Sequence, residues 1–215
     1  MHQVLIYSDS LTWGIIPNTR MRLSFDKRWP GIFEKVLIEA GIDVRIIENC
    51  LNGRRTTWPD SFKDGRDGSD GLAQTIEMHS PLSLVILMLG TNDFQCTHEN
   101  TSWLSAQGTA KLVNIVRNSP IEPGMSIPEI MIVAPPLIKE PKGDIASKFK
   151  GAHIRSIGLP DELERVANEL STLYFNAGSV TESSKVDGIH LDEPQHAILG
   201  NTIASFVLDT GILNP

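Results

Sequence analysis

Five short apolar runs divide the chain, and each has the length of a β-strand. They are Val4–Tyr7, Val44–Ile47, Leu84–Leu89, Ile130–Ala134 and Leu173–Phe175. Continuous apolar runs, as opposed to alternating ones, are typical of strands that are buried on both faces of a parallel sheet covered by helices. The pattern therefore predicts a parallel sheet of about five strands.

Between and after these runs, apolar side chains recur at intervals of three and four residues, the period of an amphipathic helix. The predicted helices are Trp29–Ala40, Ser102–Asn118, Asp161–Ser171 and a last helix that begins at Asp192 and ends at about Leu208. Asp192 is the expected N-cap, and Pro194 falls in the first turn. Strands that alternate with helices imply right-handed crossovers. The predicted fold is a three-layer α/β/α sandwich with a five-stranded parallel sheet, flavodoxin-like in strand order.

Composition limits the classes of protein to consider. The 215 residues are 40% hydrophobic and 21% charged, which fits one soluble globular domain over residues 1–215. Nineteen basic against 26 acidic residues give a net charge of −7, which disfavours a nucleic-acid partner. The longest apolar run, Leu84–Leu89, is far shorter than the ~20 residues of a membrane span. We therefore expect neither nucleic-acid binding nor a membrane span.

The N-terminus and the cysteines bear on the compartment. Met1 leads directly into the first apolar run without the basic region of a secretory signal. Cys50 and Cys96 are the only cysteines, too few for a disulfide framework and without zinc-ligand spacing. These features predict a cytoplasmic protein with free thiols. The Asp- and Gly-rich stretch Asp64–Gly71 lacks the glutamate of a calcium loop and is predicted to be a surface loop.

Residues directly after the apolar runs are the candidates for chemistry, because the carboxyl ends of parallel strands meet at one edge of the sheet. Ser10, Gly53 and Asn92 follow the first three runs, and Asp187 and His190 precede the last helix. A serine hydroxyl becomes a good nucleophile when a base takes its proton and a carboxylate orients that base. Ser10, Asp187 and His190 therefore predict a catalytic triad. The N–H groups of Ser10 and Gly53, with the Asn92 amide, predict an oxyanion hole.

These blocks resemble the SGNH (GDSL-type) hydrolase superfamily, whose marker residues are Ser, Gly, Asn and His. Ser10, Gly53, Asn92 and His190 match them in order, and Asp187 stands where the family keeps its triad acid. The strings SDSLTWG, RWPG, LNGRRTTW, LMLGTND and VDGIHLD are similar to the arylesterase and acyltransferase branch. The resemblance implies hydrolysis of short-chain aryl or acetyl esters through an acyl-enzyme on Ser10, with acyl transfer to alcohols in some members. It also implies a small ester as substrate, no metal or other cofactor, and association into a homo-oligomer.

Three positions depart from the family pattern. Ser8 stands where the family usually has glycine, and its small side chain is expected to leave the chemistry intact. Cys50 replaces a small residue and is expected to bring a thiol near the pocket. The doubled arginine, Arg54 and Arg55, makes the register after Gly53 ambiguous, and neither arginine is assigned a catalytic role.

Several candidates have a simpler structural interpretation. Ser10 alone could be a helix N-cap, and Asn92 a left-handed turn residue. Asp9 and Asp93 are expected to hold their own loops through local hydrogen bonds. Trp13 is a candidate for substrate binding that could equally pack beneath the first loop. The histidines other than His190 are expected at the surface or in packing.

Other functions of the same residues stay open at this point. A carbohydrate O-acetyl esterase, a thioesterase or a lysophospholipase would use the same triad. Leaving-group recognition is expected in the segments Ile15–Phe25 and Pro136–Ser156, which are too short for a lipase lid and favour small esters. A catalytically silent binding module is the alternative from another class, and it would be expected to lack one of the triad residues. The acidic balance suits neutral esters, which need no steering charge.

Overall fold

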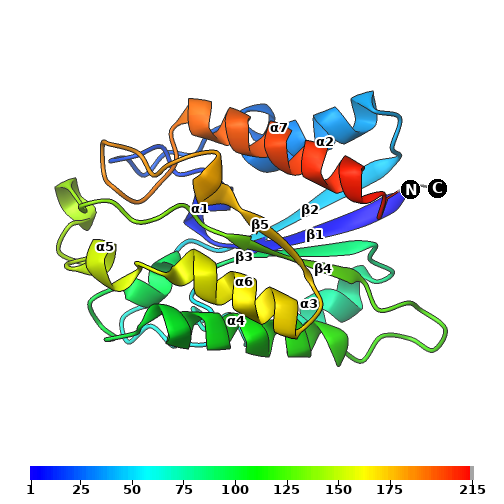
Figure 1. Cartoon of the computed structure of the whole chain (residues 1–215), viewed down its shortest axis with the longest axis horizontal. Helices are drawn as coiled ribbons and strands as arrows, with labels where there is room; N and C mark the ends of the chain where they lie inside the picture. Colours follow the sequence, from blue (N-terminus) through cyan, green and yellow to red (C-terminus); the bar gives the residue numbers. More distant parts are fainter. Residues whose placement is uncertain (214–215) are drawn as a thin grey trace.

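The computed structural model describes residues 1–213, and within them it contains one five-stranded parallel sheet with the order β2-β1-β3-β4-β5 (Figure 1). The strands are β1 (His2–Ser8), β2 (Val44–Cys50), β3 (Leu84–Met88), β4 (Glu129–Ala134) and β5 (Leu173–Asn176). All neighbouring strands pair in parallel. The predicted fold class and strand order are confirmed, and each predicted strand is present.

Helices cover both faces of the sheet (Figure 1). Helices α2 (Trp29–Glu39) and α7 (Glu193–Thr210) lie together on one face, and α3 (Leu72–His79), α4 (Ser102–Arg117) and α6 (Leu159–Glu169) lie on the other. Two short helices, α1 (Ser10–Trp13) and α5 (Ala152–Arg155), lie at the carboxyl end of the sheet. Four 3-10 turns complete the described elements: η1 (Phe25–Lys27), η2 (Thr91–Phe94), η3 (Gly143–Ile145) and η4 (Ala177–Ser179).

Among the longer helices, which cover the faces of the sheet, two differ from the sequence prediction. Helix α6 begins at Leu159, before Pro160, because a proline has no N–H to lose in the first turn and its φ angle already suits a helix. Helix α3 was not predicted. It has eight residues, of which only Leu72, Thr75 and Ile76 are buried, so its apolar period is too short to recognise. No helix within residues 1–213 combines the length and the apolarity needed to cross a bilayer.

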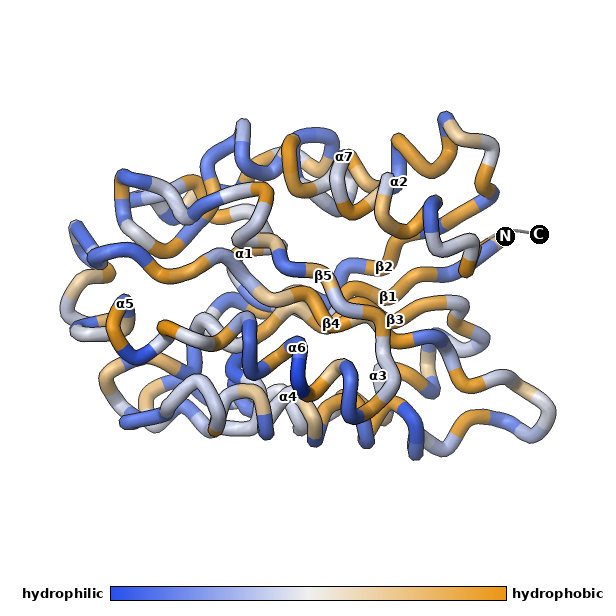
Figure 2. The backbone as a smooth tube through the Cα atoms, in the orientation of Figure 1, coloured by the Kyte–Doolittle hydropathy of each residue, from blue (hydrophilic) through white to orange (hydrophobic). Residues whose placement is uncertain are grey.

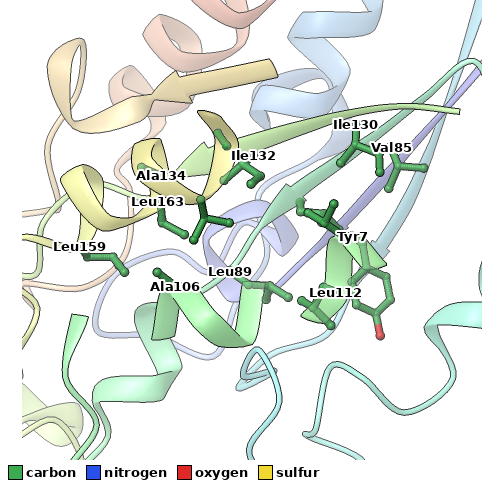
Figure 3. Packing of buried hydrophobic residues seen from close by; sticks show 14 of the residues in the cluster. Tyr7, Val85, Leu89, Ala106, Leu112, Ile130, Ile132, Ala134, Leu159 and Leu163 are labelled. Carbon is green, nitrogen blue, oxygen red and sulfur yellow. The ribbon is translucent and has the colours of Figure 1, made fainter. Parts of the chain in front are cut away.

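The pleat of the strands divides the core into two clusters. Leu5 and Tyr7 point toward α3, α4 and α6, whereas Val4 and Ile6 point toward α2 and α7. Figure 2 shows the hydrophobic residues concentrated along the central strands, and Figure 3 shows the first cluster, in which strand residues such as Ile132 meet Leu163 of α6. Burial on both faces explains why the strands read as continuous apolar runs.

Helix α4 approaches the segment after β2 unusually closely at Gly108. A Cβ atom at position 108 would lie 2.1 Å from Thr56 Oγ1, so only glycine allows this contact. Thr56 in turn donates two hydrogen bonds to the buried carboxylate of Asp93, from its N–H (2.9 Å) and from its hydroxyl (2.7 Å). The close approach of α4 therefore supports the loops that follow β2 and β3.

We expect Gly108→Ala to lower the free energy of unfolding by about 1–3 kcal/mol, because the added methyl group overpacks the contact with Thr56. Helix propensity alone predicts the opposite sign, a gain of about 1 kcal/mol. The matched control is Asn114→Ala, an exposed position in the same helix, which should leave stability unchanged or raise it. Urea denaturation of both variants measures the difference, and a stabilised Gly108→Ala protein would contradict the packing explanation.

Candidate active site

Helix α1 positions Ser10 directly after strand β1. The carboxylate of Asp9 caps the helix by accepting a hydrogen bond from Leu11 N–H (2.9 Å). Gly14 ends the helix in the left-handed region (φ 84°), and its N–H donates to the carbonyl of Ser10. A Cβ atom on Gly14 would lie 2.4 Å from Arg28 Cδ, so glycine is required both by the turn and by the packing. Ser10 is thus fixed at the carboxyl end of the sheet.

Asp187 and His190 come from one tight turn before α7. Gly188, between them, has φ 80°, and a Cβ atom there would lie 2.5 Å from the carbonyl oxygen of Glu140. The N–H of Lys139 donates to Gly188 O (2.9 Å), which holds the turn against the segment after β4. The backbone N–H groups of Ile189 and His190 both donate to Asp187 Oδ1 (2.9 Å each). The turn therefore orients its own carboxylate.

The structure brings Ser10, His190 and Asp187 into one hydrogen-bonded row. His190 Nδ1 lies 2.7 Å from Asp187 Oδ2, and His190 Nε2 lies 3.2 Å from Ser10 Oγ. All three side chains are buried. Burial by itself raises the pKa of Asp187, but the hydrogen bond and charge of His190 and the two backbone N–H groups together hold that pKa below its usual value. The ionised Asp187 accepts a hydrogen bond from the N–H at Nδ1. This tautomer leaves Nε2 without a proton, so that Nε2 can accept the proton of the Ser10 hydroxyl.

The backbone N–H groups of Ser10 and Gly53 have no protein acceptor among the described residues. Gly53 lies in the turn after β2 with φ 85°. The N–H of the next residue, Arg54, donates instead to Leu51 O (2.9 Å). This resolves the register that the doubled arginine left ambiguous, since the unbonded N–H belongs to Gly53. Arg54 itself lies over the ring of Tyr7, 3.8 Å from its centroid.

A buried chain of hydrogen bonds orients the amide of Asn92. Its Nδ2 donates to Asp9 Oδ2 (2.8 Å), and its Oδ1 accepts from Gln95 Nε2 (2.6 Å). Gln95 Oε1 accepts in turn from the fully buried guanidinium of Arg55 (2.7 Å). With one Nδ2 hydrogen bound to Asp9, the second hydrogen of that NH₂ group is available to another acceptor. The chain fixes which side of the Asn92 amide is the donor.

The loop carboxylates next to this chain are held by hydrogen bonds, and those of Asp93 come from other elements and not from its own loop, contrary to the prediction. Asp93 accepts three hydrogen bonds, two from Thr56 and one from Ser105 Oγ (2.6 Å). Burial raises the pKa of both Asp9 and Asp93 to about 6, although the hydrogen bonds that each carboxylate accepts act in the opposite direction. Ser8 fits without strain at the end of β1, where its hydroxyl donates to Met88 O (2.7 Å) and lies 2.7 Å from Thr12 Oγ1.

A cavity of about 270 Å³ opens at the carboxyl end of the sheet, and the predicted site residues line it together: Ser10, Gly53, Asn92, Asp187 and His190. Trp13 and Cys50 are not part of its lining. The ring of Trp13 instead packs against the guanidinium of Arg22, at 4.7 Å, and the Cys50 thiol donates to Ile6 O (3.7 Å) in the sheet. The thiol that we expected near the pocket thus belongs to the core.

Other lining residues come from loops whose sequences carry no motif. The segment after α1 contributes Ile15, Asn18 and Arg20, and the segment after β4 contributes Ile145 and Lys148. Both segments were expected to lie beside the pocket, although no individual residue in them was predicted. Lys63, from the surface loop after β2, was also missed. Among residues 1–213, no three metal-ligating side chains form a cluster.

Comparison with solved structures identifies the family. The chain is 33% identical to a carbohydrate acetylesterase family member from Sinorhizobium meliloti, with a TM-score of 0.92 and full coverage of both chains. The chain belongs to the SGNH hydrolase superfamily. It is also 30% identical to the M. smegmatis aryl esterase in its inhibitor-bound form, with a TM-score of 0.92 over 97% of this chain and 99% of that one.

A more distant neighbour shares the fold alone. The lipase/acylhydrolase from Enterococcus faecalis is 14% identical over 98% of this chain and 97% of its own, with a TM-score of 0.67. No family model matches the chain, and no curated protein sequence matches it. The assignment to the SGNH superfamily therefore depends on the structural neighbours that are at least 30% identical.

The raised pKa of Asp93 predicts how the stability of this SGNH protein depends on pH. The folded protein binds the Asp93 proton more tightly than the unfolded chain, so the contribution of Asp93 to the free energy of unfolding falls as pH rises from about 4 through 6. Asp93→Asn removes this contribution. The free energy of unfolding of the wild type minus that of the variant should therefore fall by about 2–3 kcal/mol as pH rises across that interval. The exposed loop residue Asp64 supplies the control, Asp64→Asn. Unfolding curves at several pH values test this, and parallel pH dependences of wild type and Asp93→Asn would contradict it.

Proposed function

We propose that the protein is a serine esterase that hydrolyses small carboxylic esters through an acyl-enzyme on Ser10. The observation that carries the proposal is the row Asp187–His190–Ser10, with spacings of 2.7 Å and 3.2 Å, at the wall of a cavity. Similarity to an aryl esterase and to a carbohydrate acetylesterase family member supports an ester as substrate. A catalytically silent module has less support, because every residue type that the chemistry needs is present and aligned.

In the proposed first step, His190 Nε2 takes the proton of the Ser10 hydroxyl while Ser10 Oγ attacks the carbonyl carbon of the ester. Asp187 holds the proton on Nδ1 and stabilises the imidazolium that forms. The negative charge that develops on the carbonyl oxygen is bound by the N–H groups of Ser10 and Gly53 and by the free hydrogen of Asn92 Nδ2. The tetrahedral intermediate then expels the alcohol, which takes its proton from His190.

The second step releases the acid. Water gives a proton to His190 Nε2 and attacks the acyl-Ser10 carbonyl, and the same N–H groups bind the oxyanion. Collapse of this intermediate returns the proton to Ser10 Oγ and frees the carboxylic acid. An alcohol in place of water would give acyl transfer by the same route, so hydrolysis and transfer share one set of residues.

Cavity size supports small esters. About 270 Å³ lies slightly below the usual range for ligand pockets, roughly 300–1,000 Å³, and would hold a short acyl chain with a compact leaving group. The acetylesterase relative makes an O-acetylated carbohydrate the second candidate substrate. A panel of p-nitrophenyl esters of increasing chain length, measured beside acetylated sugars, separates the two. Highest kcat/KM on long acyl chains would contradict the assignment to small esters.

We expect Ser10→Ala to lower kcat for p-nitrophenyl acetate by on the order of 10⁴-fold or more, because the nucleophile is lost. A fluorophosphonate probe should label the wild-type protein and leave this variant unlabelled. Ser205→Ala, on the exposed side of α7, serves as the control and should keep both activity and labelling. Normal turnover by folded Ser10→Ala protein would falsify the mechanism.

We expect Asn92→Ala to lower kcat by about 10²–10³-fold with a much smaller change in KM, because the amide contributes chiefly when negative charge develops on the substrate oxygen. Steady-state kinetics on a short-chain ester provide the measurement. Circular dichroism checks that the variant is folded, since Asn92 also binds Asp9. An unchanged kcat would remove Asn92 from the proposed oxyanion hole.

Four further properties remain proposals. We infer from the sequence and the family resemblance that residues 1–215 form a single domain and that the protein is cytoplasmic. We further infer that it binds no nucleic acid and associates into a homo-oligomer. Exposed apolar side chains such as Phe62, Met21 and Ile157 are consistent with contacts between copies. Size-exclusion chromatography with light scattering tests the oligomeric state.

A further inference from the structure

Three cationic side chains line the same cavity as the triad. Arg20 lies in the segment after α1, Lys63 in the loop after β2, and Lys148 in the segment after β4. These segments are far apart in the sequence, so it is the fold that gathers the three charges at one opening. Within residues 1–213, none of the three forms an ion pair with a carboxylate.

The carboxylates nearby do not neutralise this group. Asp187 lines the cavity but is engaged by His190 at 2.7 Å. The charge of Asp60 raises the pKa of Lys63 and of Lys148. The Asp60 side chain is, however, almost fully buried and forms an ion pair with Arg55 at 3.5 Å. Asp144 is the one other carboxylate in the lining, so a single negative charge is left to balance three positive charges. A protein of net charge −7 thus has a local excess of positive charge at its cavity.

The cations also repel one another. Burial is the first cause that lowers the pKa of Lys148, and Arg55, Lys63 and Arg20 lower it further despite the opposite effect of Asp60. Burial and the charges of Arg66 and Arg20 likewise lower the pKa of Lys63. Like charges held together without partners destabilise the protonated state of each. An anion in the cavity would relieve that repulsion.

We propose that the substrate is a small ester that carries an anionic group, such as a carboxylate, and that Arg20, Lys63 and Lys148 bind this group while Ser10 attacks the ester carbonyl. The inference rests on the proposed function and narrows its substrate class. The apolar side chains of Ile15, Ile145 and Phe149 line the same cavity and contact the uncharged part of the substrate. This revises the expectation from composition alone that an acidic chain suits neutral esters.

The first experiment compares two aryl acetates that differ only in the remote group, 4-acetoxybenzoate and 4-acetoxybenzamide. For each enzyme, the quantity measured is the ratio of kcat/KM for the anion to kcat/KM for the amide, so the intrinsic reactivity of each ester cancels between enzymes. We expect the double variant Lys63→Gln/Lys148→Gln to lower this ratio about tenfold. In the wild type the ratio should also fall as the salt concentration rises.

The matched control removes the same charge elsewhere. Lys35 and Lys111 are exposed on α2 and α4, outside the cavity. The double variant Lys35→Gln/Lys111→Gln therefore has the same net charge as the test variant and should keep the wild-type ratio. A second substrate pair, monophenyl glutarate and its neutral amide, carries the anion on the acyl side. Loss of preference in either pair supports the proposal, whereas ratios that stay unchanged in both pairs, or fall equally in the control, overturn it.

A binding measurement separates this proposal from the esterase mechanism. Calorimetry on Ser10→Ala protein compares 4-hydroxybenzoate with 4-hydroxybenzamide, with and without the two lysine substitutions. In one outcome, the wild type hydrolyses no ester, while the Ser10→Ala protein still binds the anion more tightly and loses this preference without the lysines. That outcome would retain the anion site and overturn the proposed function. Hydrolysis of both esters, with equal binding of the two ligands and unchanged ratios in both substrate pairs, would retain the esterase and overturn the anion site.

Discussion

The hydrogen bond between Asn92 and Asp9 is the contact on which the site most depends, because it joins the ends of two neighbouring strands. Asp9 follows β1 and Asn92 follows β3, and the bond between them is 2.8 Å long and buried. The same carboxylate caps the helix that carries Ser10. One buried group therefore fixes both the candidate nucleophile and the side-chain amide proposed for the oxyanion hole. A buried carboxylate is costly unless it is hydrogen-bonded, so the two loops are held in register by the need to satisfy it.

A second buried carboxylate extends this arrangement outward. Asp93 ties Thr56, after β2, to Ser105 of α4, and the absence of a side chain at Gly108 lets the helix come close enough. Loops after three adjacent strands are thus connected through two acidic side chains that do no chemistry themselves. The rigidity of the site comes from these polar contacts as much as from the apolar core beneath them.

The strands could be predicted from local signals, and the proposed triad from local signals together with the order of its motifs. Each strand is a continuous apolar run, and Asp187 and His190 lie three residues apart. Ser10 was joined to them by the order of the blocks that resemble the SGNH superfamily. Gln95 and Arg55 were not predicted as partners of Asn92, because a hydrogen bond between distant loops leaves no periodic pattern. The cations of the cavity were missed for the same reason, since Arg20, Lys63 and Lys148 lie in three unpatterned loops. Trp13 illustrates the reverse case, where proximity in sequence to Ser10 did not bring the side chain into the cavity.

The turn that contains Gly188 makes the acid and the base of the proposed triad one structural unit. His190 and Asp187 are three residues apart and are bound to each other by backbone and side-chain hydrogen bonds, whereas Ser10 belongs to the sheet. Any displacement of this turn carries base and acid together as one unit. The unit meets Ser10 through the 3.2 Å separation between His190 Nε2 and Ser10 Oγ, and the hydrogen bond from Lys139 N–H to Gly188 O ties it to the segment after β4. In the proposed mechanism, proton transfer from Ser10 therefore depends on how this one turn is placed against the end of β1.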